Sequence, residues 1–279
     1  MLDPSVLRAA SGPAARYHVD TRVGDASAVA DFGLQWRSFD PYPELVALSH
    51  GHLYGRFLLP QHFFRGKSVV DLGCGNGRLG RFAIPDAAAY VGVDLSEALL
   101  AFEVPEGARD RVDLVRASLE RLPLLDACAD VVLCWGVLHH VDDYRAAMRE
   151  IERVLKPGAT LLLYVYPDAY APRENLNRLF RVIEPPAFHA FCVWFFQTIR
   201  RMSELDPPLA QALSSALCVS PRMHTGWEVI QMFDGLGPAY HHLLEQHVRG
   251  HYTPPWSLRP THNGCFVITK PDSRLASSA

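Results

Sequence analysis

Three glycines spaced two apart, Gly73, Gly75 and Gly77, follow an apolar run that ends just after Asp71. Because glycine has no Cβ atom, backbone N–H groups in such a turn can approach a bound molecule closely. A strand, a glycine-rich turn and a helix in this order are typical of the first β–α unit of a ligand-binding sheet. The pattern therefore predicts a small-molecule site at this turn.

Two classes of ligand fit the turn. Residues 75–80 read G-N-G-R-L-G, a formal dinucleotide fingerprint, which keeps a nicotinamide-dependent reductase open as an alternative. The carboxylate of Asp71 would repel a pyrophosphate there but suits a positively charged ligand. Asp94 lies about twenty residues beyond Gly73, the separation at which an acid accepts the ribose hydroxyls of an adenosine. The other interpretation of Asp94 is a charge at a helix N-terminus.

The elements that must position these residues read as alternating strands and helices, which is typical of a parallel sheet. Apolar runs predict strands at residues 68–72, 89–93, 112–116, 130–135 and 160–166. Helices are expected from the N-cap Ser96 and over residues 143–155, the second ending at a Lys-Pro-Gly stop signal. Ligands in open α/β sheets lie outside the carboxyl ends of the strands, so the functional residues should gather there.

Four separated motifs resemble those of the class I S-adenosylmethionine (SAM) dependent methyltransferases, of the type 11, ubiquinone-biosynthesis-like group. They are D-L-G-C-G-N-G at residues 71–77, A-S-L-E-R-L-P at 117–123, L-H-H-V at 138–141 and R-V-L-K-P-G-A at 153–159. The resemblance covers roughly residues 60–166. It implies a Rossmann-like, seven-stranded, mostly parallel sheet with helices on both faces, SAM as cofactor, and methyl transfer to a small molecule.

The resemblance also implies which residues bind the cofactor. They are Asp71, Gly73, Cys74, Gly75, Asn76, Asp94, Leu95, Ser118, Leu119 and Trp135. Ser118 stands where many relatives carry an Asp that accepts from the adenine amino group. A hydroxyl can accept the same hydrogen bond without a charge, and the N–H of Leu119 can serve the ring.

His139 and His140 follow the strand whose end faces the transferable methyl group in this family, and they are the candidate catalytic residues. A neutral imidazole there could take a proton from a substrate hydroxyl or amine as the methyl arrives. The alternative is that one ring packs or caps a helix while the other bonds the cofactor. Methyl transfer from a sulfonium is already downhill, so positioning and desolvation without a dedicated base remain a third interpretation.

The chain is expected to have four parts: an N-terminal helical arm and cover (1–60), the SAM-binding core (61–166), a helical insertion (167–222) and the completion of the core (223–279). In the last part we expect a helix at 225–233 and strands at 239–248 and 264–270. The insertion is more apolar than one helix face needs, which favours a lid over the acceptor; a homodimer interface and a membrane patch are the alternatives. Expected substrate-binding residues are Trp36, Tyr166, Phe191 and Trp194.

Composition narrows the function further. The net charge is −3 and basic residues are scattered, which argues against a nucleic-acid partner. The six cysteines form no C-x-x-C pair and no histidine spacing matches a metal site, so reduced thiols and no metal are expected. No stretch is long enough to span a bilayer and no signal peptide is evident, which predicts a cytoplasmic protein.

We therefore expect SAM-dependent methylation of a small, partly apolar metabolite, with methylation at oxygen favoured over methylation at nitrogen or carbon. A non-catalytic SAM-binding partner subunit stays open beside the reductase.

Overall fold

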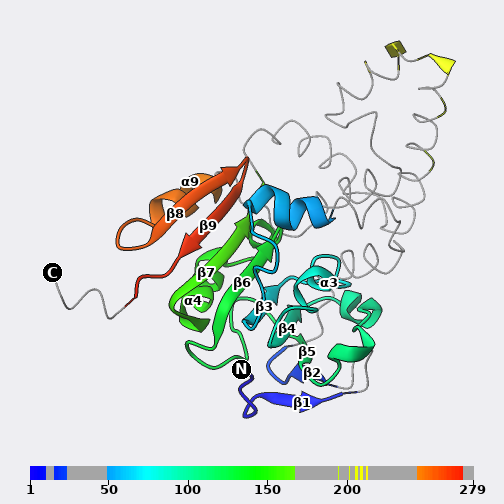
Figure 1. The fold of residues 1–279 in the computed structure, drawn as a ribbon. Coiled ribbons are helices and arrows are strands. Elements are labelled where there is room, and N and C mark those ends of the chain that lie inside the picture. Colours follow the sequence, from blue (N-terminus) through cyan, green and yellow to red (C-terminus); the bar gives the residue numbers. More distant parts are fainter. Residues whose placement is uncertain are drawn as a thin grey trace.

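A nine-stranded, mostly parallel sheet carries the fold of this computed structural model, which describes residues 1–10, 16–23, 49–166 and 244–272 and a few short stretches between 194 and 212 (Figure 1). The strands are β1 (Leu7–Ala9), β2 (Tyr17–Asp20), β3 (Ser68–Leu72), β4 (Ala89–Asp94), β5 (Val112–Arg116), β6 (Ala129–Trp135), β7 (Leu155–Tyr164), β8 (Ser257–His262) and β9 (Cys265–Thr269). Their order across the sheet is β1-β2-β5-β4-β3-β6-β7-β9-β8.

The five central strands confirm the parallel core that the alternating pattern predicts. Neighbouring strands in this part of the sheet all pair parallel, and their order in space is β5, β4, β3, β6 and β7. Their side chains are buried almost throughout, which explains why these strands read as continuous apolar runs. β7 begins at Leu155, earlier than expected, because the Lys-Pro-Gly segment lies inside the strand at a register shift opposite β6.

Helices cover both faces of this sheet and divide the core in two. On one face lie α4 (Tyr144–Val154) and α9 (Leu244–His251). On the other lie the π-helical turn η2 (Gly51–Gly55), α3 (Gly80–Ala83) and the 3-10 helix η3 (Glu97–Ala101). The predicted cap at Ser96 is present, because its side chain accepts from the Ala98 N–H, and α4 has an N-cap that was not predicted, the Asp143 side chain, which accepts from the Ala146 N–H at 2.9 Å. Two further 3-10 helices are η4 (Glu106–Ala108) and η5 (Leu138–His140).

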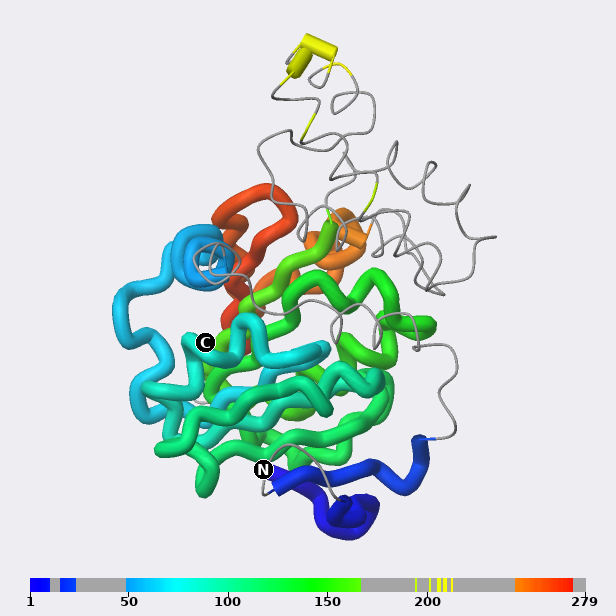
Figure 2. Tube along the Cα trace, turned by 90° about the vertical axis from the view of Figure 1, so that its right-hand side faces the viewer, coloured from blue at the N-terminus to red at the C-terminus, as the bar shows by residue number. Residues whose placement is uncertain are grey.

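The strands at residues 7–9 and 17–20 correct part of the predicted helical arm (1–60), whereas residues 49–57 are helical. Residues 7–9 and 17–20 form an antiparallel pair, and β2 continues the sheet by pairing parallel with β5, so the sheet has nine strands instead of seven. Figure 2 shows this blue segment running along the edge of the sheet. The two strands are too short to leave a periodic signal, and their pairing partner lies far along the chain.

The C-terminal region confirms one prediction and corrects another. β9 matches the strand expected at 264–270 and pairs antiparallel with β7. The strand expected at 239–248 is wrong from Leu244 onward, where α9 begins. Leu244 and Val248 are both buried whereas Gln246 midway between them is exposed, which fits one face of a helix and not the alternation of a strand. β8 was not predicted, because Pro260 interrupts it; an edge strand tolerates a proline.

Most of the insertion, and the helix expected at 225–233, lie outside the described residues. Within the described part, no helix is long and apolar enough to cross a membrane.

Candidate active site

The glycine turn between β3 and α3 is fixed by close packing. Gly73 has φ +68, and a Cβ atom there would lie 2.2 Å from a methyl carbon of Val137. Gly77 has φ +82, and its Cβ would lie 2.7 Å from the ring of Phe102. The N–H groups of Gly73 and Cys74 both donate to the carbonyl of Val93 at the end of β4. The glycines therefore allow left-handed backbone and tight contact with neighbouring elements, besides close approach of a ligand.

Asp94 joins this turn to the next helix. One carboxylate oxygen accepts from the Gly75 N–H at 2.8 Å, and the other accepts from the N–H and hydroxyl of Ser96 at 2.8 and 2.7 Å. Burial raises the pKa of Asp94, and the hydrogen bonds from Ser96 and Gly75 act against that rise. Each carboxylate oxygen has two acceptor positions, and one position on the oxygen that faces Gly75 is left, so this partly exposed group can accept from a ribose hydroxyl.

Asp71 lies beneath the turn, not on its surface. Its side chain is buried, and the hydroxyl of Tyr90 donates to it at 2.6 Å. The same hydroxyl lies under α3, because a Cβ atom at Gly80 would come within 2.2 Å of it. Burial raises the pKa of Asp71 to about 7, although the Tyr90 hydrogen bond acts to lower it. The carboxyl group therefore supports the turn from inside the core.

This burial makes Asp71→Asn a test of pH dependence. The folded state holds the proton more tightly than the unfolded state, where the carboxyl titrates near pH 3.8. Its contribution to stability is thus full below that pH and is lost as the pH rises through about 7. An asparagine does not titrate. We expect the free energy of unfolding of the variant to gain on wild type by up to about 4 kcal/mol between pH 4 and 8, measured by urea denaturation. If the free energies of unfolding of wild type and Asp71→Asn changed with pH in parallel, the raised pKa of Asp71 would be contradicted.

The predicted adenine side lies at the neighbouring strand ends. Asp94 and Arg116 are paired at the ends of β4 and β5, and the guanidinium of Arg116 donates to the carbonyl of Leu95 at 3.1 Å. Ser118 follows two residues later, and its hydroxyl accepts from the Glu120 N–H at 3.2 Å, while Leu119 is buried. A carboxylate, a hydroxyl and a glycine turn thus share the carboxyl edge of β3, β4 and β5. This donor and acceptor set fits an adenosine.

The histidines form a second cluster beyond β6. The rings of His139 and His140 lie 4.2 Å apart between centroids, and the His139 ring lies 3.8 Å from that of Tyr166. His140 meets the same tyrosine edge-on at 5.8 Å. The structure therefore brings the two candidate bases together with one predicted substrate residue. His139 is buried, whereas His140 is partly exposed.

Trp135 connects this cluster to residues 49–57, which form a helical segment. Its ring stacks on that of His52 at 5.2 Å and meets Tyr164 at 4.4 Å, and the Arg56 guanidinium lies over it at 5.8 Å. Burial, with the charges of Arg78 and Arg56, lowers the pKa of His52 to about 3, so this imidazole is neutral. The helical pattern through His52 was expected from the sequence, but its contact with Trp135 was not.

Other predicted residues are not brought to this edge by the described structure. Trp36 and Phe191 lie outside the described residues, and Trp194 is 61% exposed. Among the residues described, no three His, Cys, Asp or Glu side chains gather in a way that could hold a metal ion.

Comparison with known proteins gives a consistent result. Residues 70–163 match the family model for a type 11 methyltransferase domain. A ubiquinone biosynthesis O-methyltransferase of Hahella chejuensis is 36% identical over 44% of this chain and 51% of its own. A malonyl-[acyl-carrier protein] O-methyltransferase of Pectobacterium atrosepticum is 29% identical over 49% and 52%. A ubiquinone/menaquinone biosynthesis C-methyltransferase of Syntrophotalea carbinolica is 36% identical over 37% and 46%.

Among solved structures, an S-adenosylmethionine dependent methyltransferase from Mesorhizobium loti is 28% identical, with a TM-score of 0.36, over 48% of this chain and 57% of its own. The chain spans about half the length of the relatives it matches. The matched residues contain the glycine turn, Asp94 and both histidines. Residues 70–163 therefore form a methyltransferase domain of type 11, within the class I enzymes that use SAM as their cofactor.

Proposed function

We propose that this protein transfers a methyl group from SAM to a small, partly apolar metabolite. The observation that carries the proposal is the placement of two side-chain clusters at the carboxyl ends of two strands on either side of β3. Asp94 ends β4 and the paired histidines follow β6, and these strands flank β3 with its glycine turn. Cofactor and acceptor groups on either side of one turn are what transfer between two bound molecules requires.

In this proposal the chain's own residues bind, orient and exclude water. The carboxylate of Asp94 accepts from a ribose hydroxyl, and Ser118 with the N–H of Leu119 serves the adenine. When bound, SAM supplies a methyl group on a sulfonium, which needs a nucleophile held in line. The ring of Tyr166 lies against His139 and that of Trp135 against Tyr164, and this aromatic surface favours exclusion of water from the reacting groups.

His140 is the proposed proton acceptor, because part of its surface is exposed where His139 is buried against Tyr166; the ring nitrogens of both histidines are buried, so the proton would move inside a closed site. We expect His140→Ala to lower kcat by about a hundredfold or more, the usual contribution of a general base. The dissociation constant for SAM should change by less than about twofold. His139→Ala is the matched variant, and it should lower the melting temperature because it removes a buried ring. A kcat within about threefold of wild type in His140→Ala would show that no base acts there.

Methylation at oxygen is favoured over nitrogen or carbon. Two of the relatives named above are O-methyltransferases, and a third methylates carbon. An imidazole beside the acceptor suits a hydroxyl, whose proton must leave as the new bond to oxygen forms.

Calorimetry with SAM and S-adenosylhomocysteine tests the function, followed by a screen of hydroxylated, amine and apolar metabolites with methyl-labelled SAM. Micromolar binding and labelled product are the expected results. Binding without turnover on any acceptor would favour a non-catalytic partner subunit. Displacement of SAM by NADH would favour the reductase, and absence of SAM binding would overturn the proposal.

A further inference from the structure

The loop that follows Ser118 is held from two sides. From α4, the carboxylate of Glu150 accepts from the Leu122 N–H at 2.7 Å. From the same helix, Arg153 donates to the carbonyls of Leu122 and Leu124 at 3.1 and 2.7 Å. Leu122 and Leu124 are also buried in the core under α4. One side of residues 121–125 is therefore fixed to the central domain.

The N-terminal segment holds the other side. Its contacts are an antiparallel bridge between Leu2 and Leu124, a hydrogen bond from the Asp3 N–H to the Pro123 carbonyl (3.0 Å) and one from the Leu125 N–H to the Met1 carbonyl (2.9 Å). β2, in turn, is fixed by its parallel pairing with β5, the strand that leads into Ser118. We call residues 1–9 and 17–22 the N-terminal clamp.

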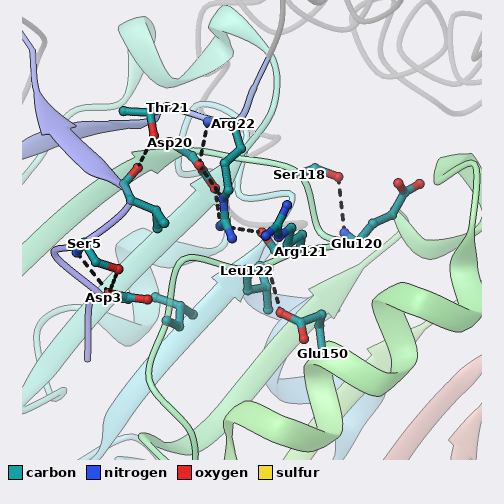
Figure 3. Close-up of polar contacts among 12 residues, drawn as sticks. Asp3, Ser5, Asp20, Thr21, Arg22, Ser118, Glu120, Arg121, Leu122 and Glu150 are labelled. Atoms are coloured by element: carbon teal, nitrogen blue, oxygen red, sulfur yellow. Dashed lines mark hydrogen bonds and ion pairs between the residues drawn. The ribbon is translucent and has the colours of Figure 1, made fainter.

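One side chain in this clamp reaches the loop directly. The guanidinium of Arg22 donates to both carboxylate oxygens of Asp20 and, at 3.2 Å, to the carbonyl of Arg121 (Figure 3). Asp20 is buried; burial alone would raise its pKa, but the hydrogen bonds from Arg22 outweigh it and the pKa is lowered. The pair therefore remains ionised, and the Asp20 carboxylate orients the guanidinium toward the loop.

The clamp acts on a segment only three residues from Ser118. Ser118 carries a hydroxyl, which binds an adenine amino group more weakly than a carboxylate does. Its contact with the ring thus depends on how accurately the loop is held, and a fixed loop loses less conformational entropy on binding. We propose that the N-terminal clamp sets the affinity for the adenosine part of SAM, with Arg22 as a positioning residue. The inference rests on the proposed function.

Arg22→Ala is the first test, with S-adenosylhomocysteine and adenosine as calorimetric probes. We expect both dissociation constants to rise about tenfold, the weight of one charge-assisted hydrogen bond. The KM for SAM should rise with them, while kcat at saturating SAM stays within about twofold. Arg22→Lys keeps the charge beside Asp20 but not the forked geometry of the guanidinium. The affinity of Arg22→Lys for both probes should therefore lie between that of wild type and that of Arg22→Ala.

Thr21→Val is the matched control. The Thr21 hydroxyl donates to the Val6 carbonyl within the hairpin and does not touch the loop. It should leave both affinities unchanged. Hydrogen exchange at the Leu122 and Leu125 amides should accelerate in Arg22→Ala and not in Thr21→Val.

The outcomes separate the clamp from the function. Equal affinities in wild type, Arg22→Ala and Arg22→Lys would overturn the clamp and leave the methyltransferase proposal intact. A rise in the dissociation constants for Thr21→Val as large as for Arg22→Ala would also overturn it, because general damage to the hairpin would then explain the effect. A wild type that binds neither probe would overturn the proposed function, and the clamp with it.

Discussion

Asp94→Ala should lose about a hundredfold in affinity for SAM and S-adenosylhomocysteine. One hydrogen bond from a ribose hydroxyl to a carboxylate contributes up to about 3 kcal/mol. The substitution also removes the acceptor for the Gly75 N–H and for Ser96, so the first turn and η3 lose their connection. Calorimetry at constant pH measures the change, with circular dichroism to verify that the variant is folded.

Asp130→Asn is the control for removing a carboxylate from the sheet. Asp130 lies near the amino end of β6 and pairs with Lys156 at 2.8 Å, at the opposite edge of the parallel strands from Asp94. It should bind SAM as wild type does even if it melts at a lower temperature. If Asp94→Ala binds SAM within about threefold of wild type, then the ribose does not lie at β4 and the proposed site is misplaced.

Gly73→Ala should unfold the glycine turn and abolish SAM binding. The new Cβ atom would meet Val137 at 2.2 Å, and the residue would have to keep a φ of +68. Strain of this kind costs about 1–3 kcal/mol, and overpacking costs a similar amount again, so the free energy of unfolding should fall by about 2–6 kcal/mol. Urea denaturation measures the loss, and calorimetry measures binding in the folded fraction.

A second glycine separates the two causes. Gly158 has φ +74 and nothing within 4 Å of a built Cβ atom, so Gly158→Ala reports the backbone strain alone. Gly73→Ala should be the more destabilising, and Gly73→Ala/Val137→Ala should recover part of the difference. If Gly73→Ala and Gly158→Ala lost the same free energy of unfolding, the contact with Val137 would not contribute to the destabilisation.

The central sheet could be predicted because its signals are local. Residues 68–72 and 112–116 match β3 and β5 at both ends, since a strand buried on two faces reads as an uninterrupted apolar run. β2 could not be predicted in this way, because four residues leave no period and their partner is β5. α9 was missed for a different reason: its apolar residues fall one turn apart in a segment too short to reveal it.

The candidate site likewise contains features that the sequence predicted and contacts that it did not. The glycine spacing and the position of Asp94 after an apolar run are sequence features, and the structure places both at one edge of the sheet. The sequence did not reveal that Asp71 would be buried and bonded to Tyr90, or that Val137 would press on Gly73. Both contacts join elements from separate β–α units, and only the packed sheet defines them.

The pairing of β2 with β5 has a consequence for synthesis on the ribosome. His18 and Asp113, which bond across these strands, are 95 positions apart. β1 and β2 leave the exit tunnel before β5, and until β5 has followed they can pair only with each other. Closing so long a loop is slow compared with forming the β3–β4 unit, whose strands are neighbours along the chain. β1 and β2 are thus made before the central strands but join the sheet after them.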